Sequence, residues 1–175
     1  HALFVLTVIY MVQYVINDGG NDLYIYRLGA ETITDGPGGP GLYEVSLDNY
    51  PFTYPPFAAL LFVPFALMPK EVGMALMMLI TAGIAWWLGW VITRYVSRRG
   101  VRIPLYEHLG TAGCASTLAL LIWASGPWRL TTHFGQINAV ILLLVLADFL
   151  RPATRVPRGV LIGIAGGIKL TPLAF

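Results

Sequence analysis

The chain has 175 residues, of which 57% are hydrophobic and only 11% are charged, and its formal net charge is +2. Because soluble domains carry about 25% charged residues, water is not the solvent for most of this chain. The arginines stand in short clusters between apolar runs rather than along one polar face, which argues against nucleic acid as a partner.

Five apolar segments have the length, or a truncated length, of membrane-spanning helices. Such a helix needs about 20 mostly apolar residues, and the segments are residues 2–16, 72–96, 109–125, 136–150 and 159–175. No barrel-like alternation recurs along the chain, so we predict an all-α, polytopic transmembrane helix bundle. The sequence starts without Met inside one apolar run and stops inside another. We therefore expect residues 1–175 to form a single membrane-embedded module that is a fragment of a longer chain.

Residues 17–71 form a long loop after the first predicted span. Apolar residues at positions 23, 26, 30 and 33 recur at helical spacing, and Asp22 stands where it could cap a helix. We therefore predict an amphipathic helix over residues 23–34, ended by the glycine- and proline-rich run 36–41. The apolar stretch 57–68 is shorter than a span and is bracketed by prolines, which favours a surface or re-entrant helix.

Two arginine clusters predict the orientation in the plasma membrane. Because two predicted spans separate them, they lie on one side, and arginine-rich short loops stay in the cytoplasm. The clusters are Arg94, Arg98, Arg99 and Arg102, and Arg151, Arg155 and Arg158. The loops 17–56 and 126–135 are then both extracytoplasmic, unless residues 57–68 cross the membrane and place the long loop in the cytoplasm.

The long loop contains four candidate functional residues. Asp22 could be a general base, or it could only cap the helix. Tyr26 and Arg27 could bind a sugar and a phosphate, although such residues also anchor helices at the membrane surface. Tyr54 precedes two prolines that fix its backbone and give its ring a defined direction, or that merely stiffen the entry to the next helix.

Four more candidates lie later in the chain. His133 could act as an acid, a base or a phosphate ligand near neutral pH, whereas Gln136 and Asn138 could bind substrate or join neighbouring helices. Lys169 follows an apolar run, where an unpaired ammonium costs roughly 2.5–3.5 kcal/mol. It needs an anionic partner, either Asp148 or a bound phosphate. No spacing typical of a metal site occurs, so we predict neither a metal nor a cofactor.

Four short segments carry a family resemblance: 21–27 (NDLYIYR), 52–57 (FTYPPF), 135–138 (GQIN) and 168–172 (IKLTP). Together they resemble glycosyltransferase family 87, the actinobacterial polyprenol-phosphate-mannose-dependent mannosyltransferases. The resemblance implies the GT-C architecture, with juxtamembrane helices in the first loop and an extracytoplasmic active site. It also implies a polyprenyl-phosphate-mannose donor and a mannosylated glycolipid or lipoglycan acceptor, such as a phosphatidylinositol mannoside or lipoarabinomannan, usually in α-1,2 linkage.

The resemblance also implies roles for individual residues. The acidic residue of the first-loop motif falls on Asp22, which becomes the expected general base of a one-step inverting displacement, with Arg27, His133 and Lys169 as candidates to stabilise the departing phosphate. Two alternatives are a transporter or flippase of lipid-linked sugars and another polyprenyl-phosphate-dependent polymerase or ligase. A transporter should hold its polar groups near the bilayer midplane, whereas the enzyme should gather them around Asp22 and Tyr54.

Overall fold

The computed structural model describes residues 1–36, 38–101, 104–152 and 156–174, with the side chains of all of these except residues 12–18 and 104–106. It is mostly helical, as predicted. The elements are α1 (Ala2–Asp18), α2 (Asn21–Thr34), β1 (Ser46–Leu47), β2 (Tyr50–Pro51), α3 (Pro56–Ala66), α4 (Lys70–Arg98), α5 (Pro104–Ala124), α6 (Gly126–Phe134), α7 (Asn138–Leu150), α8 (Val160–Ile168) and η1 (Thr171–Ala174). The two strands form one short antiparallel hairpin, which the sequence patterns do not predict.

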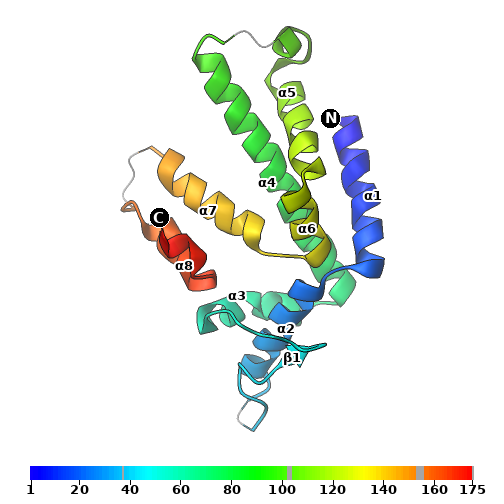
Figure 1. The fold of residues 1–175 in the computed structure, drawn as a ribbon, viewed down its shortest axis with the longest axis vertical. Coiled ribbons are helices and arrows are strands. Elements are labelled where there is room, and N and C mark those ends of the chain that lie inside the picture. Colours follow the sequence, from blue (N-terminus) through cyan, green and yellow to red (C-terminus); the bar gives the residue numbers. More distant parts are fainter. Residues whose placement is uncertain (37, 102–103, 153–155, 175) are drawn as a thin grey trace.

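Helices α4 and α5 lie side by side and form the long axis of the molecule (Figure 1). Their close approach depends on Gly89, because a Cβ there would lie only 2.4 Å from the carbonyl oxygen of Ala115. The 29 residues of α4 rise about 43 Å, enough to cross a bilayer. Helix α5 bends by 76° into α6, and this bent pair could form a second span.

The last two predicted spans, 136–150 and 159–175, are shorter than expected. In the described part of the chain only α4, and the α5–α6 pair if it counts as one span, have the length and composition to cross a membrane. Helix α7 has 13 residues and α8 has nine. Helix α8 ends at Ile168 because Pro172, four residues later, has no N–H to donate to the Ile168 carbonyl and its ring would clash with that carbonyl. The prediction of one helix through residues 159–175 is therefore wrong.

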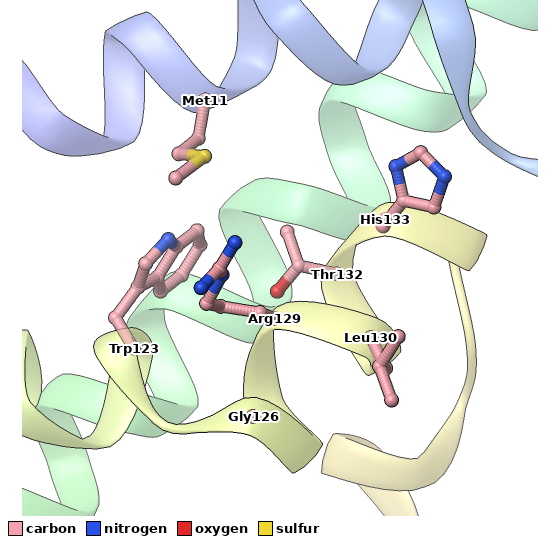
Figure 2. Close-up of a pocket in the computed structure, with 7 residues that line it drawn as sticks. All are labelled: Met11, Trp123, Gly126, Arg129, Leu130, Thr132 and His133. Carbon is pink, nitrogen blue, oxygen red and sulfur yellow. The ribbon is translucent and has the colours of Figure 1, made fainter.

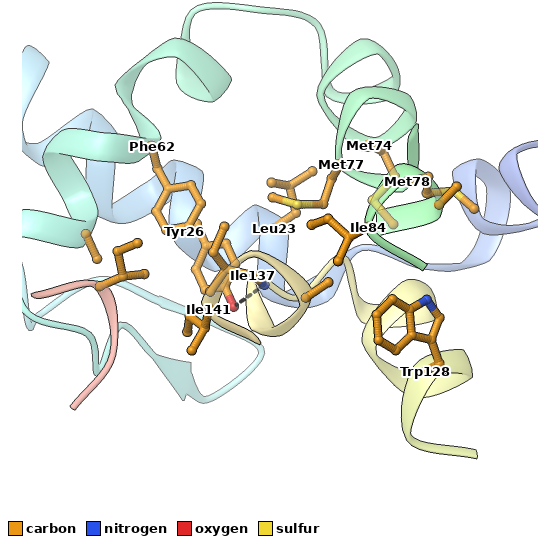
Figure 3. Close-up of a cluster of buried hydrophobic side chains, with 14 of the residues drawn as sticks. Leu23, Tyr26, Phe62, Met74, Met77, Met78, Ile84, Trp128, Ile137 and Ile141 are labelled. Atoms are coloured by element: carbon orange, nitrogen blue, oxygen red, sulfur yellow. Dashed lines mark hydrogen bonds between the residues drawn. The ribbon is translucent and has the colours of Figure 1, made fainter. Parts of the chain in front are cut away.

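Helices α2 and α3 and the hairpin lie together at the Lys70 end of α4 (bottom of Figure 1). The predicted amphipathic helix is confirmed as α2, whose buried face includes Leu23, Tyr26 and Ala30, whereas Ile33 is exposed. Helix α3 has 11 residues and rises about 16 Å, roughly half the thickness of the hydrocarbon. The buried side chains of these helices and of α4 meet in one core (Figure 3).

The two arginine clusters lie at one end of the molecule, as expected. Arg94 and Arg98 of α4 line the same pocket as Arg151, which follows α7. Arg102 and Arg155 are outside the described residues. Since α2 and α3 lie at the opposite end of α4, the arginines and the predicted catalytic loop are separated along the length of that helix.

The side chain of Asp148, near the end of α7, connects this helix to the start of α8. It is 2% exposed, and one carboxylate oxygen accepts a hydrogen bond from Arg151 at 2.7 Å. The other oxygen accepts hydrogen bonds from the backbone N–H groups of Gly159 (2.6 Å) and Ile162 (3.4 Å), so that Asp148 caps α8 from another helix. The hypothesis that Asp148 pairs with Lys169 is therefore wrong, because its partners are Arg151 and the start of α8.

Candidate functional site

Asp22 is held at the start of α2 but does not cap it. The residue before the helix is Gly20, in the left-handed conformation with φ 94°, and Asp22 lies in the first helical turn. Its carboxylate instead accepts a hydrogen bond from the side chain of Gln136, with 2.8 Å between Nε2 and Oδ2. The N-cap interpretation of Asp22 is therefore wrong, and the carboxylate faces the junction of α6 and α7.

A row of hydrogen bonds extends from Asp22 to Lys169. Gln136 Oε1 accepts a hydrogen bond from Asn138 Nδ2 at 2.7 Å, and Asn138 Oδ1 accepts one from Lys169 Nζ at 3.1 Å. We call these four side chains the polar network. Each amide oxygen accepts its hydrogen bond from the neighbour nearer Lys169, and each amide N–H donates to the neighbour nearer Asp22. The two amide dipoles are therefore aligned and stabilise the negative charge on Asp22. The structure thus brings four of the predicted site residues, Asp22, Gln136, Asn138 and Lys169, into one connected group.

Two tyrosines lie against the polar network. The hydroxyl groups of Tyr26 and Tyr54 are 3.1 Å apart, and the Tyr54 ring lies 5.8 Å from Lys169 Nζ. The Tyr26 hydroxyl also accepts a hydrogen bond from the backbone N–H of Ile137, between Gln136 and Asn138 (Figure 3). Burial raises the pKa of both tyrosines above the usual value. Tyr26 is fully buried and its hydroxyl group is paired with that of Tyr54, so Tyr54 is the tyrosine that can donate to a ligand.

The turn between α6 and α7 presents Gln136 to Asp22. Gly135 ends α6 in the left-handed conformation, with φ 67° and ψ 36°. A Cβ at this position would also lie 3.0 Å from both the Leu23 Cβ and the Met74 Sδ atoms, so glycine is needed for both conformation and space. The backbone N–H of Gly20 then donates to the carbonyl of His133 at 2.8 Å, which ties the start of α2 to the end of α6.

Arg27 lies in a different place from that expected of a phosphate ligand. Its side chain is 8% exposed, and its guanidinium donates hydrogen bonds to the carbonyl oxygens of Phe65, Ala66 and Met68 at the end of α3. These carbonyls lack partners within their own helix, and the positive charge complements the negative end of the helix dipole. The geometry therefore assigns Arg27 to holding α3 against α2.

His133 lies on α6, a nine-residue helix where a loop was expected. Its side chain lines a pocket of about 490 Å³ together with Arg129, Thr132 and residues of α1 and α5 (Figure 2). The imidazole does not belong to the polar network, although its backbone carbonyl contacts the start of α2. Arg129 is a cation beside His133 that the sequence interpretation overlooked, and its place one helical turn before His133 was the available signal.

Lys169 supplies the positive charge of the polar network. It directly follows α8 in an extended conformation and is half-buried. In the described residues no carboxylate lies within ion-pair distance of its ammonium, whose contacts are the Asn138 oxygen and the Tyr54 ring. A partly buried cation with only neutral partners favours a bound anion. Two amide side chains separate it from Asp22.

Comparison with known proteins identifies the family. The sequence profile of glycosyltransferase family 87 matches residues 52–175. The chain is 37% identical over 172 residues to a polyprenol-phosphate-mannose-dependent alpha-(1-2)-phosphatidylinositol pentamannoside mannosyltransferase of Mycolicibacterium smegmatis, covering 91% of this chain and 37% of that protein.

A second relative supports the same assignment. The chain is 32% identical over 164 residues to a polyprenol-phosphate-mannose-dependent alpha-(1-2)-phosphatidylinositol mannoside mannosyltransferase of Mycobacterium tuberculosis, covering 88% of this chain and 38% of that protein. The chain thus spans less than two fifths of the length of either relative. No solved structure matches the chain. Because the family profile covers well over half of its residues, this membrane protein belongs to glycosyltransferase family 87.

Proposed function

We propose that the protein transfers mannose from polyprenyl-phosphate-mannose to a phosphatidylinositol mannoside or related lipoglycan, forming an α-1,2 linkage with inversion at the anomeric carbon. The names of its relatives support the donor and the kind of acceptor. The observation that carries the proposal is the polar network, which joins a carboxylate to an ammonium through two oriented amides. An inverting transfer from a lipid phosphate needs a base and a cation, and the network holds one of each.

In the proposed mechanism, Asp22 acts as the general base. Its Oδ2 atom is held by Gln136, whereas Oδ1 has no hydrogen-bond partner in the described part of the chain. Oδ1 takes the proton of an acceptor hydroxyl as that oxygen forms a bond to the anomeric carbon, and the bond from that carbon to the lipid phosphate breaks. Lys169 stabilises the negative charge that develops on the phosphate, and the Tyr54 hydroxyl group, held in place by Tyr26, orients the sugar.

The position of the polar network favours an enzyme over a transporter. Gln136 and Asn138 lie at the start of α7, Asp22 lies at the start of α2, and Lys169 directly follows α8. All four are therefore at helix ends, whereas a translocation path requires polar groups near the middle of the spans. The direct test uses the intact purified protein with labelled polyprenyl-phosphate-mannose and phosphatidylinositol mannosides. Formation of an α-1,2-linked product supports the proposal, whereas transfer of an oligosaccharide, or movement of unchanged donor across the bilayer, contradicts it.

The extracytoplasmic position of the long loop can be tested by cysteine labelling. Ser46 is exposed on β1, and Val101 is exposed at the arginine-rich end of α4. In a Cys114→Ala background, we expect Ser46→Cys to react with a membrane-impermeant maleimide in intact cells, and Val101→Cys to react only after lysis. The reverse pattern would place the polar network in the cytoplasm and exclude this topology.

Replacement of Lys169 tests its proposed contact with the donor phosphate. We expect Lys169→Met to lower kcat/KM for the donor roughly 10- to 100-fold, because a hydrogen bond to a charged group contributes about 1.5–3 kcal/mol. The matched control is Lys70→Met, which removes an exposed ammonium that lies 5.0 Å from the Tyr24 ring. Equal activity of the folded Lys169 and Lys70 variants would limit Lys169 to a structural role.

A further inference from the structure

A second candidate site lies at the arginine-rich end of the molecule. A pocket of about 450 Å³ is formed between α4 and α7. Its walls include the apolar side chains of Trp87, Val91 and Leu150, and its charged residues are Arg94, Arg98 and Arg151. Because the two helices contribute both kinds of residue, the pocket combines an apolar surface with a concentration of positive charge.

A smaller pocket continues from the first. It has a volume of about 360 Å³ and shares Trp90 and the two arginines of α4 with the larger pocket. Its remaining lining residues are Ser97 and Thr111, both with hydroxyl groups. The pair of pockets therefore passes from an apolar chamber to a polar one, with Arg94 and Arg98 between them. This is the arrangement that an amphiphile requires.

Two of the three positive charges in the pocket, those of Arg94 and Arg98, are not balanced by a carboxylate in the described part of the chain. Arg151 is neutralised by Asp148 and held by the carbonyl oxygens of Val156 and Pro157. Arg94 stacks on the Trp90 ring with its guanidinium carbon 4.8 Å from the centroid. Within the described ranges, neither Arg94 nor Arg98 has a carboxylate within ion-pair distance. Two guanidinium groups beside a polar chamber suit the oxygens of a phosphate, which guanidinium groups bind in bidentate fashion.

We propose that this pocket binds an anionic phospholipid of the cytoplasmic leaflet. Its phosphate lies between Arg94 and Arg98, and the start of an acyl chain lies against Trp87 and Val91. The apolar chamber lies along α4, the helix long enough to span the bilayer, so it opens where acyl chains are present. Basic pockets between helices at the cytoplasmic side are suited to such headgroups. Arg94 and Lys70 are separated along α4 by a rise of about 36 Å, so the lipid site is distinct from the polar network.

The test compares two pairs of arginines in the intact protein. Native mass spectrometry measures retention of phosphatidylglycerol against phosphatidylcholine with the same acyl chains. We expect selective retention of phosphatidylglycerol, lowered at least 10-fold in the Arg94→Gln/Arg98→Gln variant. The matched control is Arg129→Gln/Arg158→Gln, which removes the same charge from exposed residues outside the pocket and should leave retention within two-fold. Melting temperature and size-exclusion profile establish that each variant is folded.

Two further measurements separate a lipid from a soluble phosphate. Val91→Trp fills the apolar chamber and leaves both arginines in place, so it should also lower phosphatidylglycerol retention several-fold. Inorganic phosphate and glycerol phosphate at millimolar concentration should not displace the lipid. The proposal is overturned if the control pair lowers retention as much as the pocket pair, if folded Val91→Trp retains the lipid fully, or if inorganic phosphate competes with it.

Discussion

Replacing Asp22 with Asn is expected to lower mannosyl transfer 10²- to 10⁴-fold, the range typical of lost general-base assistance, which is about 3 to 5 kcal/mol of barrier. The amide has the shape of the carboxylate, and its oxygen can still accept the hydrogen bond from Gln136. It cannot accept the proton of the acceptor hydroxyl. Stability should change by less than about 1 kcal/mol, the typical value of a carboxylate in the first turn of a helix. Initial rates and thermal melting measure the two effects separately.

The control for this experiment is Asp35→Asn, because Asp35 is exposed at the other end of α2 and its replacement removes the same charge from the same helix. It should retain nearly full activity. If the Asp22 variant also reacts within a few-fold of the unmodified protein, Asp22 is not the base. The base must then be sought at Asp18, Glu44, Asp48 or His133, or elsewhere in the protein.

Replacing Arg27 with Met is expected to lower the free energy of unfolding by about 3 kcal/mol. The change removes a charged donor from the carbonyl oxygens of Phe65, Ala66 and Met68. Those carbonyls then remain in a buried place without partners, at about 1–3 kcal/mol for each group left unsatisfied. We expect a lower melting temperature and a lower yield of monodisperse protein, with activity falling only in proportion to the folded fraction.

Arg129→Met is the matched control, because Arg129 is exposed on α6 and its loss removes the same charge without a buried partner. It should melt close to the unmodified protein. The same pair of variants also decides between the two interpretations of Arg27. A stable Arg27→Met protein with a strongly raised KM for the donor would restore the phosphate-binding role and contradict the structural one.

The sequence predicts the components of the candidate site better than their contacts. Lys169 stands out because an ammonium after an apolar run is energetically unusual, a criterion that depends only on local sequence. Asp22 becomes the expected base only through the family resemblance of residues 21–27. The role of Arg27 could not be predicted in this way, because its acceptors lie 38 to 41 positions away and become its neighbours only when α3 packs on α2. The role of Asp148 could not be predicted for the same reason. Its carboxylate accepts a hydrogen bond from Gly159, which is 11 positions away at the start of α8.

For the fold as well, features set by the local sequence were predictable, whereas helix ends and short strands were not. Helices α2 and α4 follow from periodicity and apolar length, and the structure confirms both. The break after α8 was missed because hydropathy alone does not record where a helix ends. Pro172 carried the missing signal, since a proline cannot donate a hydrogen bond to the carbonyl four residues before it, which here belongs to Ile168, the last residue of α8. The hairpin at residues 46–51 was missed because two-residue strands leave almost no alternation to detect.

The order of synthesis gives the polar network a further consequence. Asp22 leaves the ribosome with α2, but Gln136 follows 114 positions later, and Lys169 comes 31 positions after Asn138. During biogenesis, the carboxylate is therefore present long before the ammonium that completes its surroundings. A nascent protein interrupted before α8 therefore has the proposed base, Asp22, without the proposed phosphate-binding cation, Lys169. Under the proposed mechanism, an intermediate that lacks Lys169 is expected neither to hydrolyse the donor nor to transfer mannose.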